Sequence, residues 1–134
     1  MSGPISDLRE LLRSMRPLLH DGTYVFASLP HDADIGALEP LATFREHEGL
    51  SVVVEEGRAK LAQLEILFRA AWITLTVHSD LQAVGLTAAV AAALTEANIS
   101  CNVIAAARHD HVFVPLESAR AAIEVLEDLQ RRHR

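Results

Sequence analysis

Hydrophobic and polar positions follow helical spacing in some parts of this chain and strict alternation in others. Near the start, one helix face is outlined by Leu8, Leu11, Leu12 and Met15. Their i, i+3, i+4, i+7 spacing predicts an amphipathic helix over 6–16, which Ser6 would cap and Pro17 would end. The short aromatic and β-branched run 23–29 predicts a strand.

The rest of the first half predicts a hairpin followed by a short helix. Residues 30–40 mix Pro, Gly, Asp and His, which is typical of a loop or an irregular helix. Strands are expected at 42–47 and 50–54, on either side of Glu48-Gly49. A helix is expected over 55–64, although Gly57 weakens it.

The second half begins with the cleanest alternation in the chain, over 72–78. The aliphatic row of this strand is expected to face the core; it consists of Ile73, Leu75 and Val77. Ser79 and Gln82 have the spacing of a capping box, which predicts that an alanine-rich helix opens there. Asn98 is expected to end this helix in a left-handed conformation.

Two further strands and a last helix complete the pattern. The strands are expected at 99–106 and 112–115, joined at His109-Asp110-His111, and the helix at 117–131. The second half thus has the order β-α-β-β-α. The first half offers a similar order with its first helix shortened or missing. A degenerate duplication would divide the chain into units 1–65 and 66–134.

Two segments of the second half resemble the ACT domain. They are Ser-Asp-Leu-Gln-Ala-Val-Gly-Leu at 79–86, in the first strand-to-helix turn, and Asn-Ile-Ser-Cys-Asn-Val at 98–103. Over roughly residues 8–130, the chain also resembles a small bacterial group of uncharacterised tandem ACT-like proteins. The recurring segments of that group resemble 24–26, 46–50, 78–89 and 109–115.

This resemblance implies a ferredoxin-like α+β fold of βαββαβ units, with an antiparallel sheet, helices on one face and a degenerate first unit. It also implies a function, because ACT domains typically bind amino acids or other small metabolites and regulate an attached enzyme. The two units would account for all 134 residues. We therefore expect a small-molecule-binding regulatory protein that is not itself an enzyme. The alternative is a structural or protein-interaction homodimer with no small ligand.

Ligands of ACT domains usually lie near the turn after the first strand and on the neighbouring second strand. The expected ligand-binding residues are therefore His78, Ser79, Asp80, Val84, Gly85, Leu86, Asn102 and Val103. Amide groups at the helix N-terminus would bind a carboxylate, and Asp80 would pair with an ammonium group. Structural roles are also open: Ser79 as a helix cap, Gly85 in tight packing, and Asn102 bonded to the sheet edge or to Asn98.

The histidines allow a metal hypothesis. His109 and His111 would share one face of a strand, with Asp110 opposite, but zinc needs a third ligand from His78 or His47. The same residues could instead form a ligand or partner surface, or simply the polar turn of a hairpin. We favour the turn and expect no metal and no cofactor.

Acid–base chemistry could come from two charged hairpins, Glu46-His47-Glu48 and His109-Asp110-His111. Solvated hairpin charges explain these residues more simply. The chain has no nucleophile motif, no Gly-rich phosphate loop and no paired-carboxylate signature. We expect no catalytic residues, and we expect Cys101 to be a small core residue.

Composition narrows the partners. The formal net charge of −6 argues against a nucleic-acid backbone as the main partner. No apolar run is long enough to span a bilayer, the N-terminus lacks a signal-peptide pattern, and the single cysteine allows no intrachain disulfide. We expect a cytoplasmic protein that binds neither nucleic acid nor membrane. The resemblance to ACT-like proteins, whose sheets commonly pair edge to edge or pack face to face, implies a homodimer.

Overall fold

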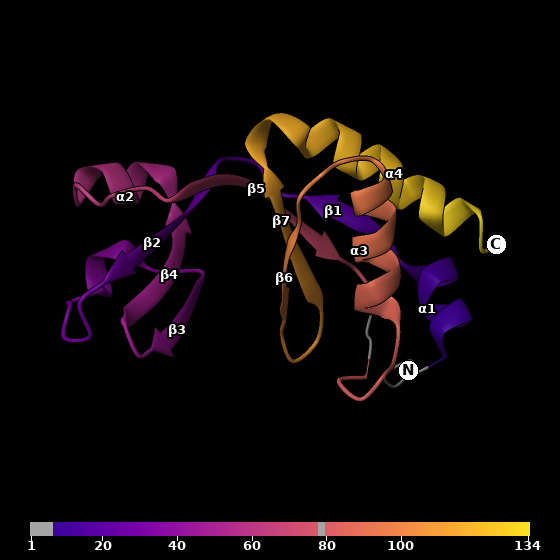
Figure 1. Ribbon diagram of the computed structural model, residues 1–134, viewed down its shortest axis with the longest axis horizontal. Helices are drawn as coiled ribbons and strands as arrows, with labels where there is room; N and C mark the ends of the chain where they lie inside the picture. The colour runs from indigo at the N-terminus through magenta and orange to yellow at the C-terminus, as the bar shows by residue number, and fades with distance from the viewer. Residues whose placement is uncertain (1–6, 78–79) are drawn as a thin grey trace.

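The computed structural model describes residues 7–77 and 80–134, in which seven strands form one antiparallel sheet (Figure 1). The strands are β1 (Pro17–Leu19), β2 (Tyr24–Leu29), β3 (Ala42–Glu46), β4 (Gly49–Glu55), β5 (Phe68–Leu75), β6 (Asn102–Ala105) and β7 (Asp110–Pro115). Their order is β3-β4-β2-β5-β7-β6, and β1 also pairs with β5. The helices are α1 (Leu8–Ser14), α2 (Glu56–Leu61), α3 (Leu86–Glu96) and α4 (Ala119–Arg131).

Strand β5 belongs to both halves of the sheet. Its residues 68–70 pair with β2, and its residues 73–75 pair with β1 on the same side. On its other side, residues 70–75 pair with β7. The halves therefore share a strand and form a continuous sheet. The division into 1–65 and 66–134 stays a prediction.

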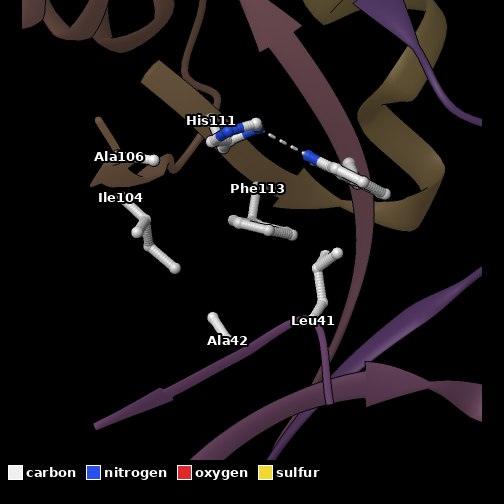
Figure 2. Close-up of a pocket in the computed structure, with 7 residues that line it drawn as sticks. Leu41, Ala42, Ile104, Ala106, His111 and Phe113 are labelled. Carbon is white, nitrogen blue, oxygen red and sulfur yellow. Dashed lines mark hydrogen bonds between the residues drawn. The ribbon is translucent and has the colours of Figure 1, made fainter. Parts of the chain in front are cut away.

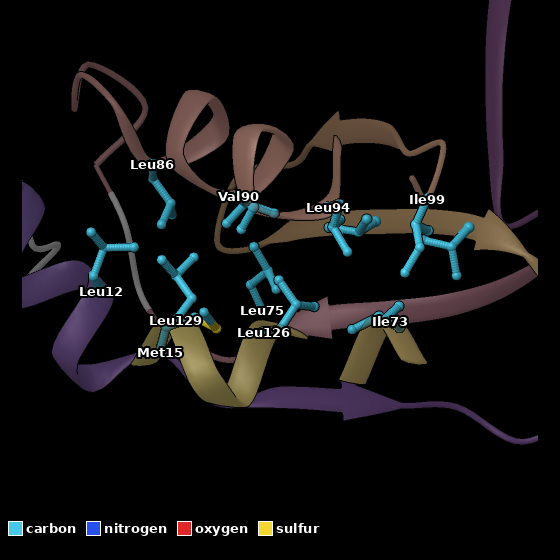
Figure 3. Packing of buried hydrophobic residues seen from close by; sticks show 14 of the residues in the cluster. Leu12, Met15, Ile73, Leu75, Leu86, Val90, Leu94, Ile99, Leu126 and Leu129 are labelled. Atoms are coloured by element: carbon cyan, nitrogen blue, oxygen red, sulfur yellow. The ribbon is translucent and has the colours of Figure 1, made fainter. Parts of the chain in front are cut away.

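The α-helices pack on one face of the sheet, in two groups. Over the second half, α1, α3 and α4 cover a core that includes Ile73, Leu75, Val90, Val112 and Leu126 (Figure 3). Over the first half, α2 and the 3-10 turn η1 (Gly36–Leu38) cover a smaller core, in which Val25, Val52 and Val54 are fully or almost fully buried. The first helix of this half is shortened to that turn, as the sequence predicted.

The beginning of the chain completes the second half rather than the first. Leu11 and Leu12 of α1, and Met15 directly after it, are buried in the same core as α3 and α4. Figure 3 shows Leu12 and Met15 in this core. The buried Gln130 of α4 donates a hydrogen bond to the carbonyl of Arg13 over 2.6 Å. Strand β1 then adds an edge to β5. The sequence pattern predicted the helix but not its partners.

Alternation along β5 is confirmed, since Ile73, Leu75 and Val77 all face the helix-covered core. The strand itself begins earlier than predicted and ends at Leu75, because its first residues are held by pairing with β2. The left-handed Asn98 after α3 is also confirmed, with φ of 60°.

Three predicted helix starts are wrong in detail. Helix α1 begins at Leu8, and its N-cap is Asp7, whose carboxylate accepts from the amide of Glu10; Ser6 lies outside the described residues. The capping box at Ser79 and Gln82 does not start α3, because the Gln82 amide donates to Asp80 Oδ1 and the chain turns once more before Leu86. The last helix is preceded by the 3-10 turn η2 (Leu116–Ser118).

The predicted hairpin between the last two strands is also shifted. Asp110 and His111 belong to β7, and the turn lies before them, with the Ala106 amide donating to the carbonyl of His109. Near the end of the last helix, Asp128 pairs with Arg132 at 3.2 Å and with Arg131 at 3.9 Å. None of the described helices has the length and apolar character needed to span a membrane.

Candidate functional site

A small cavity of about 150 Å³ lies where α3 begins, beside the ends of β6 and β7. We call it the turn cavity. Its walls come from the loop before α3, from the first residues of that helix and from two strand residues. They are Asp80, Leu81, Ala83, Gly85, Leu86, Thr87, Ala105 and Asp110.

The loop that lines the turn cavity is shaped by Asp80 and Gly85. The Asp80 carboxylate accepts from the Gln82 amide over 2.8 Å, and its carbonyl accepts from the Ala83 amide over 2.9 Å. Gly85 occupies the N-cap position with φ of 107°, which disfavours any residue with a side chain. A Cβ there would also lie 2.9 Å from Leu8 Cδ2 of α1. The positive φ is therefore the main reason for a glycine here, because the end of the flexible Leu8 side chain can shift to relieve the contact.

The N-terminus of α3 carries no side-chain cap. The first amide groups of a helix have no intrahelical acceptor, and the helix dipole adds partial positive charge there. Leu86 and Thr87, the first two residues of α3, both line the turn cavity. This end of the cavity is suited to a carboxylate or another anion.

Asp110 gives the opposite side of the turn cavity a buried negative charge. It shares the helix-facing row of β7 with Val112 and Val114, and its exposed fraction is 8%. Burial raises the pKa of its carboxyl group, an effect that the nearby His111 and His109 partly offset. None of the described residues donates a hydrogen bond to this carboxylate. The described residues contain no fully buried side-chain oxygen or nitrogen that lacks a partner, so the Asp110 carboxylate oxygens reach the cavity or solvent. A negative charge at the wall of a small cavity favours a cationic group.

The Asp110→Asn variant is expected to be more stable than the wild type at neutral pH, because it removes a buried charge. The folded-state pKa of Asp110 is raised above its ordinary value of 3.8, so the folded protein takes up this proton before the unfolded chain does. The difference in free energy of unfolding between the variant and the wild type should therefore shrink as pH falls through the raised pKa of Asp110. Urea unfolding of both proteins at several pH values measures the difference. A gap that widens on acidification would contradict the assignment.

The structure brings only part of the predicted ligand set together. Asp80, Gly85 and Leu86 line the turn cavity, whereas Val84 is 83% exposed and does not. His78 and Ser79 lie outside the described residues.

The two predicted ligand-binding residues on β6 do not line the turn cavity. Asn102 is exposed and pairs in register with Phe113, on the face of the sheet away from the helices. Val103 faces the helices but packs against the core. Alternation along β6 places Asn102 on the other face of the sheet from the turn cavity. The ligand-binding role of Asn102 and Val103 stays a prediction.

Sequence reasoning placed Asp110 in a turn and missed it as a site residue. The sequence did contain one indication. In a strand, Asp110 alternates with Val112 and Val114 and shares their core-facing side, where a charged residue is unusual. Thr87 and Ala105 also line the cavity, and no sequence pattern singled them out.

The described residues contain no group of three or more His, Cys, Asp or Glu side chains placed to hold a metal ion. His109 Nδ1 lies 3.2 Å from the carbonyl oxygen of Val77, and His111 interacts with Trp72. Glu46, His47 and Glu48 are exposed on their hairpin. Cys101 is half-buried against the core, and burial raises the pKa of its thiol, which suits a packing role.

Comparison with known proteins shows the family. Two family models, each described as an ACT domain, match residues 3–71 and 68–128. The matches overlap at 68–71, within the strand that both halves of the sheet share. No curated protein sequence matches the chain.

Three solved structures show the same fold. A protein of unknown function from Vibrio cholerae, described as a possible transport protein, is 49% identical with a TM-score of 0.84, over 92% of this chain and 95% of that chain. A protein from Agrobacterium tumefaciens is 17% identical with a TM-score of 0.70, over 87% and 89%. The ligand-free regulatory subunit of aspartate kinase from Thermus thermophilus is 12% identical with a TM-score of 0.65, over 88% and 97%. With two matching domain models that together span most of its length, the chain belongs to the ACT-domain family.

Proposed function

We propose that this protein is a regulatory ACT-domain protein that binds a free amino acid in the turn cavity and has no catalytic activity of its own. One observation carries the proposal: the carboxylate of Asp110 and the uncapped N-terminus of α3 line the same small cavity. An amino acid presents an ammonium group and a carboxylate a short distance apart, and thus matches both. Family membership supports the proposal, because ACT domains are known as regulatory amino-acid-binding modules.

In this arrangement the ligand carboxylate accepts hydrogen bonds from the first amides of α3, and the ammonium group lies toward Asp110 and Asp80. The volume of about 150 Å³ equals roughly five water molecules at their density in the liquid. We therefore expect an amino acid with a small side chain to fit best.

A thermal-shift screen of the individual amino acids tests the proposal. A ligand at about 100 times its Kd stabilises the folded state by about 2.7 kcal/mol, which raises the melting temperature by several degrees. We expect at least one amino acid at about 10 mM to give such a shift. Asp110→Asn should abolish it, because the ammonium group loses its buried partner.

Asp32→Asn is the matched control, since Asp32 is exposed and does not line the turn cavity. This variant should keep the full shift. A shift that persists in Asp110→Asn would mean that the ligand binds at another site. The absence of a shift with every amino acid would favour a structural or protein-interaction role.

The resemblance to ACT-like proteins implied a homodimer, and the open edges of the sheet support it. Strands β3 and β6 end the strand order, and among the described residues each has a row of backbone groups that no further strand pairs with. Pairing between copies would satisfy these groups. Sedimentation velocity over a range of protein concentrations measures whether the chain associates.

A further inference from the structure

The face of the sheet opposite the helices carries a cluster of aromatic side chains, which we call the aromatic face. Its members are Tyr24, Phe26, Phe68, Trp72 and Phe113. The Phe113 ring meets that of Phe26 edge-on, with centroids 5.4 Å apart, and lies nearly parallel to that of Trp72 at 6.5 Å. This face is separate from the turn cavity, because neighbouring residues of β7 alternate: Asp110 faces the helices and His111 faces the aromatic rings.

A second cavity of about 150 Å³ opens on the aromatic face. Trp72, Phe113 and His111 line it from the centre of the sheet, while Ala42 of β3 and Ile104 of β6 line it from the two ends of the strand order. The sheet therefore curls around this space. Figure 2 shows Leu41 and Ala42 across the cavity from His111 and Ala106.

His111 supplies the polar group of this cavity, and its neighbours determine its tautomer. The Trp72 indole N–H donates to His111 Nδ1 over 3.0 Å, and Thr74 Oγ1 lies 3.0 Å from the same nitrogen. An indole nitrogen can only donate, so His111 Nδ1 carries no proton. In the neutral ring the proton is then on Nε2, which donates to no described residue. The ring presents one donor to whatever fills the cavity.

His20, which contacts Thr74 of the same hydrogen-bond network, helps to hold Trp72 in place. His20 Nε2 lies 2.7 Å from Thr74 Oγ1, and the His20 ring stacks on the indole with centroids 3.5 Å apart. Burial, followed by the nearby His109 and His20, lowers the pKa of His111, an effect that Asp110 partly opposes. The imidazole is accordingly neutral at physiological pH. Among the described residues, no Asp, Glu, Lys or Arg lines the cavity, so an ion bound there would find no counter-charge from them.

From this geometry we propose that the aromatic-face cavity binds a small uncharged molecule, with an apolar body about the size of one ring and one oxygen that accepts a hydrogen bond from His111 Nε2. A dry apolar cavity of about 150 Å³ is known to hold benzene in another protein. The apolar side chains contact the ring of the ligand, and the single donor orients its oxygen. This proposal does not depend on the proposed amino-acid site and holds even if no amino acid binds in the turn cavity.

Trp72 makes the proposal directly testable, because it is the only tryptophan of the chain and it lines the cavity. A ¹H–¹⁵N NMR spectrum therefore contains one indole resonance. We expect benzyl alcohol to shift this resonance in a saturable way. Toluene, which has the same ring but no oxygen, should bind roughly fivefold more weakly because it makes no hydrogen bond to His111.

Ala106→Leu and Ala107→Leu form a matched pair of variants on the exposed hairpin between β6 and β7. Ala106 lines the cavity and Ala107 does not, so only the first should abolish the shift. Binding that survives Ala106→Leu, no shift up to the solubility limit, or toluene binding as tightly as benzyl alcohol would overturn the proposal. An indole resonance that moves with protein concentration instead would mean that a second copy fills the cavity, which also overturns it.

Discussion

Replacing Phe113 by alanine is expected to lower the free energy of unfolding by about 3–5 kcal/mol. Phe113 is 1% exposed, and its ring packs against those of Phe26 and Trp72. Truncation removes the buried ring and leaves a void that the paired strands on either side cannot close, because backbone hydrogen bonds hold them in place. Urea denaturation followed by far-ultraviolet circular dichroism measures the loss.

Phe44→Ala is the control for this variant. Phe44 lies on the edge strand β3 and is 73% exposed, so its truncation should change the free energy of unfolding by less than about 0.5 kcal/mol. Similar losses in the two variants would mean that Phe44 is covered in solution, for instance by a second copy of the chain.

Leu11→Ala is expected to cost about 2–5 kcal/mol, and its effect should appear far along the chain. Leu11 is fully buried in α1, among core residues supplied by β5, β7, α3 and α4. Hydrogen exchange should therefore show the largest loss of protection in α3 and α4. The hairpin of β3 and β4 has a separate core and should be affected less.

Leu61→Ala, at a site that is 88% exposed, is the matched control and should leave stability nearly unchanged. If Leu11→Ala lowered protection mainly in the first half, α1 would pack there in solution. That result would contradict the completion of the second half by the start of the chain.

The sequence predicted the local elements well, because each depends on nearby residues. The alternation of Ile73, Leu75 and Val77 indicated which face of β5 is buried, and this is confirmed. The left-handed Asn98 was equally local. The helix start predicted from Ser79 and Gln82 was wrong. The Gln82 amide donates to Asp80 instead, and Gly85, with its positive φ, precedes the helix.

The candidate sites depended more strongly on tertiary structure. Asp80 and Gly85 could be selected from one continuous segment. Asp110 could not, because its importance comes from the burial of a charge beside a helix that begins 24 residues earlier. The aromatic-face cavity could not be predicted for the same reason, since Leu41 and Ile104 come to line one cavity only when the sheet curls.

By itself, the sequence determined the order of the helices and of every strand except β1. These follow from spacing and from local backbone preferences. Its recurring segments also indicated the family by resemblance. Only the tertiary structure decided that α1 and β1 complete the second half, that β5 serves both halves, and that Asp110 and His111 line different cavities. The reason is physical: strand pairing and burial join residues far apart in the chain, and the hydrophobic pattern shows that a residue is buried without showing what covers it.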